Sequence, residues 1–222
     1  MKRYIIIITV LFLFVACDSS IFSGKLKEGT IEYKLEYLDD ANEKPIISLL
    51  PTEMKIQFKK AYYLQSVEGW MGVFRMVGVN NVNAKKKSAL LKMMNKKYLY
   101  QVDGNSEGFG FKPMKDKKIE YTEEIKEIAG YKCKKANITW NDYKFAIYYT
   151  DKIKIDEPNW NNPFPEIKGV LLEYQYEMFN IKTKVTAISV IKEDIEDEIF
   201  EIPADYKNVS KKEMEDVIND LM

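Results

Sequence analysis

The stretch TIEYKLEY, residues 30–37, alternates strictly between polar and apolar side chains. Neighbouring side chains of a β-strand point to opposite faces of the sheet, so this period of two predicts a strand with one buried face and one wet face. The same alternation recurs at residues 54–59, 98–102 and 145–149. Turn-forming pairs such as Asp103-Gly104 follow these runs. Weaker strands are predicted at 62–67, 73–79, 88–94, 118–122, 131–139, 170–178 and 181–191. The pattern therefore predicts a mainly β fold with an antiparallel sheet.

Two segments carry helical signals instead. Residues 39–50 lie between predicted strands, contain several aliphatic side chains and stop at Pro51. Ser210 and Glu213 have the spacing of a capping box, in which each side chain binds a free backbone N–H group of the other residue. Apolar residues then recur at helical spacing, which predicts a short C-terminal helix over 211–221.

The N-terminus has the parts of an export signal. Lys2 and Arg3 precede an apolar run of about 12 residues, whereas a membrane-spanning helix needs about 20. The run ends in Ala16-Cys17, which fits the lipobox of bacterial lipoproteins, where the cysteine thiol accepts diacylglycerol. We therefore predict that residues 1–16 form a signal peptide and that Cys17 is lipidated. An ordinary signal peptide with an incidental cysteine is the alternative.

This interpretation divides the chain into three parts. Residues 17–27 form a lipidated tether, and residues 28–222 form a single β-rich domain with a C-terminal helix. Cys133 then has no intrachain partner, because Cys17 is the only other cysteine. The lysines beside Cys133 could make its thiol reactive, and a buried, inert strand thiol is the alternative.

Composition excludes several classes of function. The chain has no histidine, which removes Ser-His-Asp and Cys-His catalysis and histidine-ligated zinc. Without residues 1–16, 32 basic residues face 34 acidic ones, a balance that suggests neither nucleic-acid binding nor a polybasic membrane patch. Glu123-Glu124 and the acidic run at 193–198 could serve a carboxylate-based hydrolase, but such runs are usually solvated surfaces. We expect no catalytic residue, no metal, no cofactor and no enzymatic activity.

Aromatic side chains are abundant, with 15 Tyr, 11 Phe and 3 Trp. An apolar surface with hydroxyl groups at intervals suits an amphipathic ligand, although strands and cores also favour aromatics. The side chains predicted to line such a site are Tyr33, Tyr37, Met54, Ile56, Phe58, Met93, Tyr98, Tyr100 and Tyr149. In the proline-rich segment 157–165, Trp160 and Phe164 either form a lid over this site or pin the loop to the core.

Three short motifs carry a resemblance to a known family. They are IAGYKCKKA at 128–136, PEIKG at 165–169 running into LEY at 172–174, and FEIPADY at 200–206. In this order they resemble uncharacterised Bacteroidota lipoproteins and their GLPGLI-type relatives, which are thought to share the architecture of the LolA and LolB lipoprotein carriers. The resemblance implies a strongly curved antiparallel sheet, an incomplete barrel, with short helices on its concave side and at the C-terminus. It supplies no catalytic residues, and in the carriers the concave space receives acyl chains.

The sequence thus predicts a membrane-anchored envelope lipoprotein that binds a lipid or another hydrophobic ligand inside a curved sheet. Its expected place is the outer membrane, facing the periplasm. The expected partners are the membrane, through the N-terminal lipid, and the hydrophobic ligand, with no nucleic acid. The alternative is a non-enzymatic scaffold or interaction subunit of an envelope complex.

Overall fold

A computed structural model describes residues 24–104, 106 and 108–220. The predicted signal peptide, Cys17 and most of the tether therefore lie outside the described residues.

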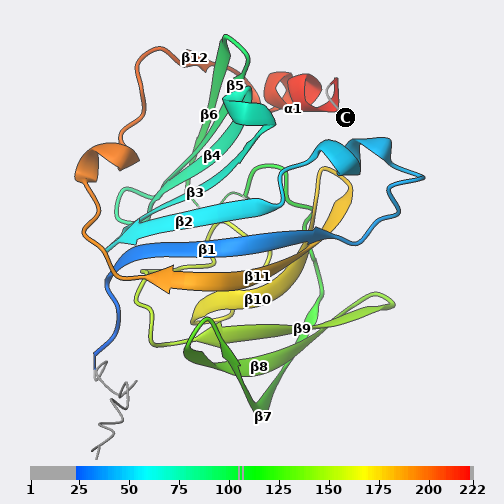
Figure 1. The fold of residues 1–222 in the computed structure, drawn as a ribbon, viewed down its shortest axis with the longest axis vertical. Helices are drawn as coiled ribbons and strands as arrows, with labels where there is room; N and C mark the ends of the chain where they lie inside the picture. The colour runs from blue at the N-terminus through cyan, green and yellow to red at the C-terminus, as the bar shows by residue number, and fades with distance from the viewer. Residues whose placement is uncertain (1–23, 105, 107, 221–222) are drawn as a thin grey trace, which may run out of the picture.

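Within the described part, twelve strands form one curved sheet that does not close into a barrel (Figure 1). The strands are β1 (Glu28–Tyr37), β2 (Glu53–Lys59), β3 (Tyr62–Gly69), β4 (Phe74–Asn81), β5 (Lys86–Met93), β6 (Lys96–Asp103), β7 (Lys118–Ile128), β8 (Tyr131–Trp140), β9 (Tyr143–Thr150), β10 (Val170–Met178), β11 (Ile181–Ile191) and β12 (Lys207–Asn208). The predicted mainly β, strongly curved fold is confirmed.

The sheet consists of two antiparallel meanders. Strands β1 to β6 follow one another across one half, and β7 to β11 follow one another across the other. The last strand of the second meander, β11, pairs antiparallel with β1 in the middle of the sheet. The short β12 pairs parallel with β6 at one edge, and β7 forms the other edge.

The alternation in β1 is realised as the sequence predicts. Ile31, Tyr33 and Leu35 are buried, whereas Lys34 and Glu36 are exposed. The buried side chains belong to a large core cluster that also includes residues of β2, β8, β9, β10 and β11. One face of β1 therefore builds the core, as expected for a strand of period two.

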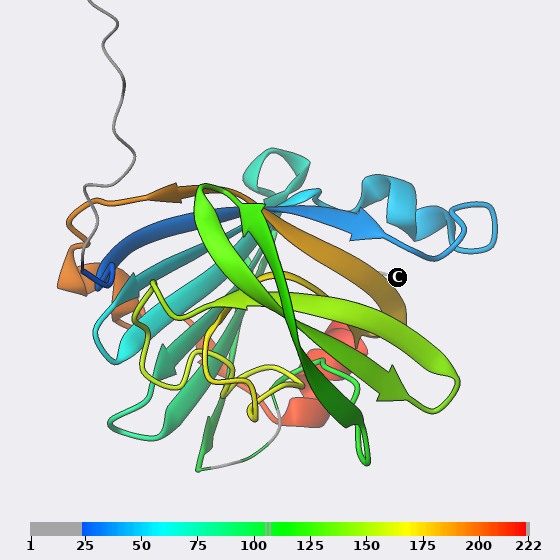
Figure 2. The ribbon, with the colours of Figure 1, turned by 90° about the horizontal axis from the view of Figure 1, so that it is seen from below.

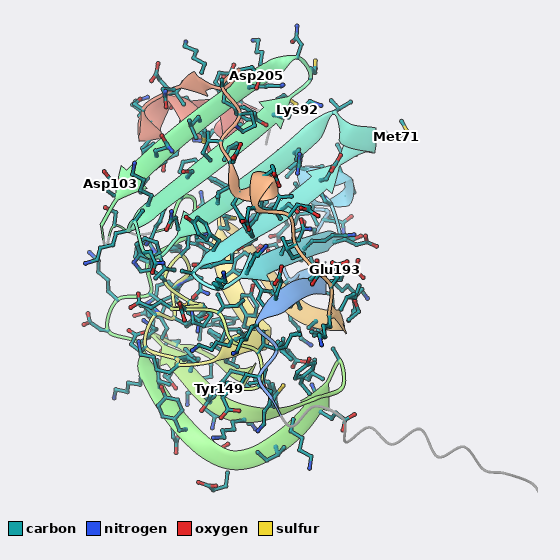
Figure 3. All side chains as sticks on the ribbon, turned by 90° about the vertical axis from the view of Figure 1, so that its left-hand side faces the viewer. Met71, Lys92, Asp103, Tyr149, Glu193 and Asp205 are labelled. Atoms are coloured by element: carbon teal, nitrogen blue, oxygen red, sulfur yellow. The ribbon has the colours of Figure 1, made fainter. Side chains whose placement is uncertain are left out.

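The two faces of the sheet are covered differently. We call the side that holds α1 (Lys211–Asn219) and residues 151–169 the concave side (Figure 2). On the opposite, convex side, residues 192–206 cross strands of the first meander (Figure 3). This crossing segment includes the 3-10 helix η3 (Asp197–Phe200) and buries Ile195 and Phe200 against Leu64 and Leu90. Strands β3 to β5 thus have buried residues on both faces, so their sequences alternate less clearly.

The C-terminal helix is confirmed, with its predicted cap. The backbone N–H of Glu213 donates to Ser210 Oγ at 3.2 Å, and the N–H of Ser210 donates to Glu213 Oε2 at 2.7 Å. Met214 and Ile218 are buried, and they pack with Leu91 and Phe109 on the concave side. Among the described residues, no helix is long and apolar enough to cross a membrane.

The helix predicted over 39–50 is wrong except for one turn. Only the 3-10 helix η1 (Pro45–Leu49) forms there, and none of its residues is buried. Proline disfavours a helical conformation of the residue before it, and Lys44 is indeed non-helical, with φ −129° and ψ 80°. Asp39 instead accepts hydrogen bonds from the backbone N–H of Lys182 (2.6 Å) and from Lys44 Nζ (3.1 Å), which fixes this segment as a turn.

Candidate ligand-binding site

Three adjoining cavities lie on the concave side of the sheet. The outer cavity has a volume of about 110 Å³, the middle cavity about 40 Å³ and the inner cavity about 20 Å³. The outer and middle cavities share Val67, Met76 and Met178 in their walls, and the middle and inner cavities share Gln65 and Asn161. The three spaces therefore follow one another along the sheet.

The outer cavity is almost entirely apolar. Its walls come from β1, β3, β4, β10, β11, η1, α1 and the turns beside them: Leu35, Tyr37, Ile46, Leu50, Pro51, Val67, Phe74, Met76, Tyr176, Met178, Phe179, Ile181, Thr183 and Ile218. The hydroxyl of Tyr37 donates to the carbonyl oxygen of Pro51, and burial raises the pKa of Tyr37 to about 12. Since this hydroxyl is already bonded to backbone, the wall offers a ligand mainly apolar contact.

The middle cavity has a buried cation in its wall. Only 5% of Lys87 is exposed, and its Nζ donates to the carbonyl oxygens of Ser106 (2.5 Å) and Trp160 (2.8 Å). The Trp160 ring lies over the same ammonium, 4.3 Å from nitrogen to ring centroid. No carboxylate of a described residue forms an ion pair with Lys87. Burial lowers the pKa of Lys87 from 10.5 to about 8.

A second polar side chain lies beside Lys87. Asn80 pairs with Lys87 across β4 and β5 and has no exposed surface. Neither Nδ2 nor Oδ1 of Asn80 has a hydrogen-bond partner among the described residues. A buried amide without a partner costs about 1–3 kcal/mol for each unsatisfied group, so this position needs an explanation.

Four of the nine predicted lining residues reach these cavities. Tyr37 lines the outer cavity, Tyr100 the middle cavity, and Tyr33 and Ile56 the inner cavity. The hydroxyl of Tyr33 donates to the carbonyl oxygen of Leu171 at 2.9 Å.

The other five side chains lie elsewhere. Met54 and Phe58 are fully buried in the main core, Met93 is buried opposite Phe74, Tyr98 packs beside α1, and Tyr149 lies edge-on to the exposed Tyr121. The reason is that residues 109–114 and 153–167 supply apolar side chains that fill much of the concave side, including Phe109, Phe111, Met114, Ile155, Phe164 and Ile167. Most of the predicted face is therefore core.

The two predicted lid residues have different environments. Phe164 has no exposed surface and packs edge-on with Phe145, with ring centroids 6.1 Å apart. Its placement matches the alternative in which an aromatic side chain pins the loop to the core. Trp160 is partly exposed and its ring lies over Lys87, but it is not part of the wall of the middle cavity.

Two other candidate reactive groups, Cys133 and Glu124, are a buried thiol and a carboxylate in an ion pair. Cys133 has no exposed surface, and burial raises its pKa to about 12, so it is the inert strand thiol of the alternative interpretation. Glu124 pairs with Lys135 at 2.7 Å. Among the described residues, no three potential metal ligands come together. A larger hollow of about 710 Å³ between residues 106–117 and 157–168 has mixed polar and charged walls.

Lys87 is the site residue that the sequence analysis did not find, although a signal was present. In β5, Lys87 has the same phase as Ala89, Leu91 and Met93, which belong to an apolar face. A lysine in register with an apolar stripe is a candidate for burial, and buried lysines are uncommon without a partner. Asn80 could not be found this way, because its neighbourhood depends on the register between β4 and β5.

Comparison with known proteins defines the fold only. No protein-family model matches the sequence, and no curated protein matches it. Among solved structures, the chain is similar to PNGF-II in the P21 and C2 space groups. Both comparisons give a TM-score of 0.55 over 88% of this chain, at 14% and 15% sequence identity. The chain spans about a third of the length of that protein (34% and 33%), and the likeness shows a shared β fold.

The buried charge of Lys87 predicts a pH dependence of stability. A group whose pKa is lower in the folded state binds fewer protons there, so the free energy of unfolding rises with pH between the folded and unfolded pKa values. Relative to Lys87→Met, we expect the wild type to gain about 2 kcal/mol between about pH 8 and about pH 10. Urea unfolding of both proteins at both pH values measures this gain. Lys34→Met, at an exposed position of β1, is the control. If the wild type gains as much stability relative to Lys34→Met as relative to Lys87→Met, the pH dependence does not come from the buried charge of Lys87.

Proposed function

We propose that this protein is a lipid-anchored lipoprotein of the bacterial cell envelope that binds a lipid or another hydrophobic ligand on the concave side of its sheet. The observation that carries the proposal is the outer cavity, whose walls are almost entirely apolar. Such a concave apolar surface with a few polar groups nearby is typical of ligand sites. The motifs shared with lipoproteins of carrier-like architecture support the same function.

The size of the outer cavity limits what it holds in this conformation. Sites for drug-sized ligands measure about 300–1,000 Å³, whereas a cavity of about 150 Å³ holds one benzene molecule. The outer cavity, at about 110 Å³, is smaller than that and therefore accepts a short stretch of acyl chain. A longer chain extends along the concave side only if α1 shifts. This helix has nine residues, and its buried contacts come from Met214 and Ile218. So short a helix depends on these contacts for its stability.

The N-terminal sequence supports the anchor. Lipid on Cys17 would hold the domain near a membrane through residues 17–27, at the outer membrane facing the periplasm. A ligand of this protein is then a molecule present at that membrane, which favours acyl chains over soluble metabolites.

An exposed apolar rim favours a second function, that of an interaction subunit in an envelope complex. Met71 is fully exposed, and Met94 and Val73 are 68% and 39% exposed. The N–H of Met94 donates to the carbonyl oxygen of Val73 at 2.8 Å, so these two residues lie together at the ends of their strands. Figure 3 shows Met71 projecting from the same end of the sheet. Exposed apolar side chains that gather at one place are typical of protein contacts.

Filling the outer cavity should weaken ligand binding. Val67 lines both the outer and the middle cavity, so Val67→Phe places a ring in the ligand space at a cost of about 1–3 kcal/mol in stability. We expect the affinity for octan-1-ol to fall at least about tenfold by isothermal titration calorimetry. Ile125→Phe, at an exposed position of β7, should leave the affinity unchanged. Equal affinities of wild type and Val67→Phe would rule out the concave site.

Removing the lipidated thiol should release the protein from the membrane. In a bacterial host that expresses the whole chain, Cys17→Ser should lose incorporation of labelled palmitate and move from the membrane fraction to the soluble fraction. Cys133→Ala is the matched control and should keep both properties, because Cys133 is buried. If the Cys17→Ser protein still carries labelled palmitate and stays in the membrane fraction, lipidation at this residue is contradicted.

The interaction function makes a separate prediction for the rim. Met71→Ser combined with Met94→Ser should change stability by no more than about 0.5 kcal/mol, because both side chains are exposed. The double variant should lose any protein that crosslinks to the wild type in native membranes, as read by mass spectrometry. Ile125→Ser serves as the exposed control. If the double variant keeps every crosslinked partner, the rim is not the interaction surface.

A further inference from the structure

The cavity walls become more polar from the outer cavity to the middle cavity. The outer cavity has almost only apolar walls, whereas the middle cavity adds Lys87, Gln65 and Asn161. Because the two cavities share Val67, Met76 and Met178, one ligand can contact both. A molecule that matches this gradient has an apolar chain at one end and a polar group at the other.

The charge of Lys87 is incompletely compensated by the protein. Its ammonium has three N–H donors, and two carbonyl oxygens accept from it. Carbonyl oxygens and an aromatic ring offset part of the desolvation cost, but a full negative charge is absent among the described neighbours. Buried charges in proteins are as a rule paired, so the remaining donor is suited to an anion.

Asn80 is a second buried polar group in the neighbourhood of the middle cavity. Its fully buried amide has an unpaired donor and an unpaired acceptor, on the same face of the sheet as Lys87. Gly78 lies next to it on this face and lines the middle cavity. A Cβ at Gly78 would lie 3.6 Å from Asn161 Nδ2, which lines the same cavity, and 3.9 Å from Asn80 Nδ2, which lies beside the cavity but does not line it.

We infer that the concave site takes an amphipathic carboxylate, with its carboxylate bound by Lys87 at the middle cavity and its apolar chain in the outer cavity. This inference rests on the proposed function and narrows it to anionic ligands of the fatty-acid type. A carboxylate accepts the remaining hydrogen bond of the Lys87 ammonium and supplies the negative charge. An alternative role for Lys87 is purely structural, as a clamp that joins residue 106 to residue 160 through their carbonyl groups.

Two ligands with the same chain and different head groups separate these roles. We expect wild-type protein at about pH 7 to bind octanoate at least about tenfold more tightly than octan-1-ol in calorimetric titrations, because a charge-assisted bond to Lys87 is formed only by octanoate. Lys87→Met keeps a similar side-chain length without charge, and it should lose the preference by weakening octanoate binding alone. Lys34→Met, at the exposed position of β1, should change neither affinity.

The outcomes distinguish the inference from the function on which it rests. Equal affinity of the wild type for the two ligands, or a preference that survives in Lys87→Met, would overturn the carboxylate site and leave hydrophobic binding intact. Failure of the wild type to bind either ligand would contradict hydrophobic binding itself. The comparison of octanoate with octan-1-ol on the wild type tests the carboxylate site even if Lys87→Met does not fold. Circular dichroism and thermal melting verify the fold of each variant.

Discussion

The antiparallel pairing of β1 with β11 is the constraint on which the rest of the structure depends. It joins Thr30 to Ile191 at one end and Tyr37 to Thr183 at the other, and so links the first strand of one meander to the last strand of the other. A bulge next to Tyr33 interrupts the register, and bulges strengthen local twist. Without this pairing the chain would form two smaller sheets with separate edges. With it, a single curved sheet gains a concave side large enough to hold α1 and two long loops (Figure 2).

The fold could be predicted from the sequence where its causes are local. The alternation of TIEYKLEY fixes which face of β1 is buried, and the Ser210–Glu213 capping box fixes the start of α1. The helix expected before Pro51 failed because Pro45 restricts Lys44 and because Asp39 binds a residue more than a hundred positions away. The site could be predicted only in part, since its walls come from strands and loops that meet only after folding. Tyr37 and Tyr100 could be predicted from their positions in the alternating pattern of their strands. Asn80 could not, because its position beside Lys87 is set by the register between β4 and β5.

Filling of the concave side explains why the cavities are small. Side chains of the long loops, such as Phe111 and Phe164, pack against aromatic side chains of the sheet and occupy the concave side. What remains is a narrow series of cavities with a buried ammonium in the wall. A buried lysine without a carboxylate costs stability, and proteins tolerate such a cost mainly at functional sites. Lys87 therefore distinguishes the middle cavity from ordinary packing defects, which are apolar and few.

The methionine methyl groups allow the central claim, ligand binding on the concave side, to be tested directly. Met76 and Met178 line both the outer and the middle cavity, whereas Met71 and Met94 lie on the exposed rim. In protein labelled with ¹³C at the methionine methyl groups, NMR titration with octanoate should shift the signals of Met76 and Met178 and give contacts from both to the ligand chain. The signals of Met71 and Met94 should stay in place. Shifts confined to Met71 and Met94 would contradict binding on the concave side and assign the ligand to the rim.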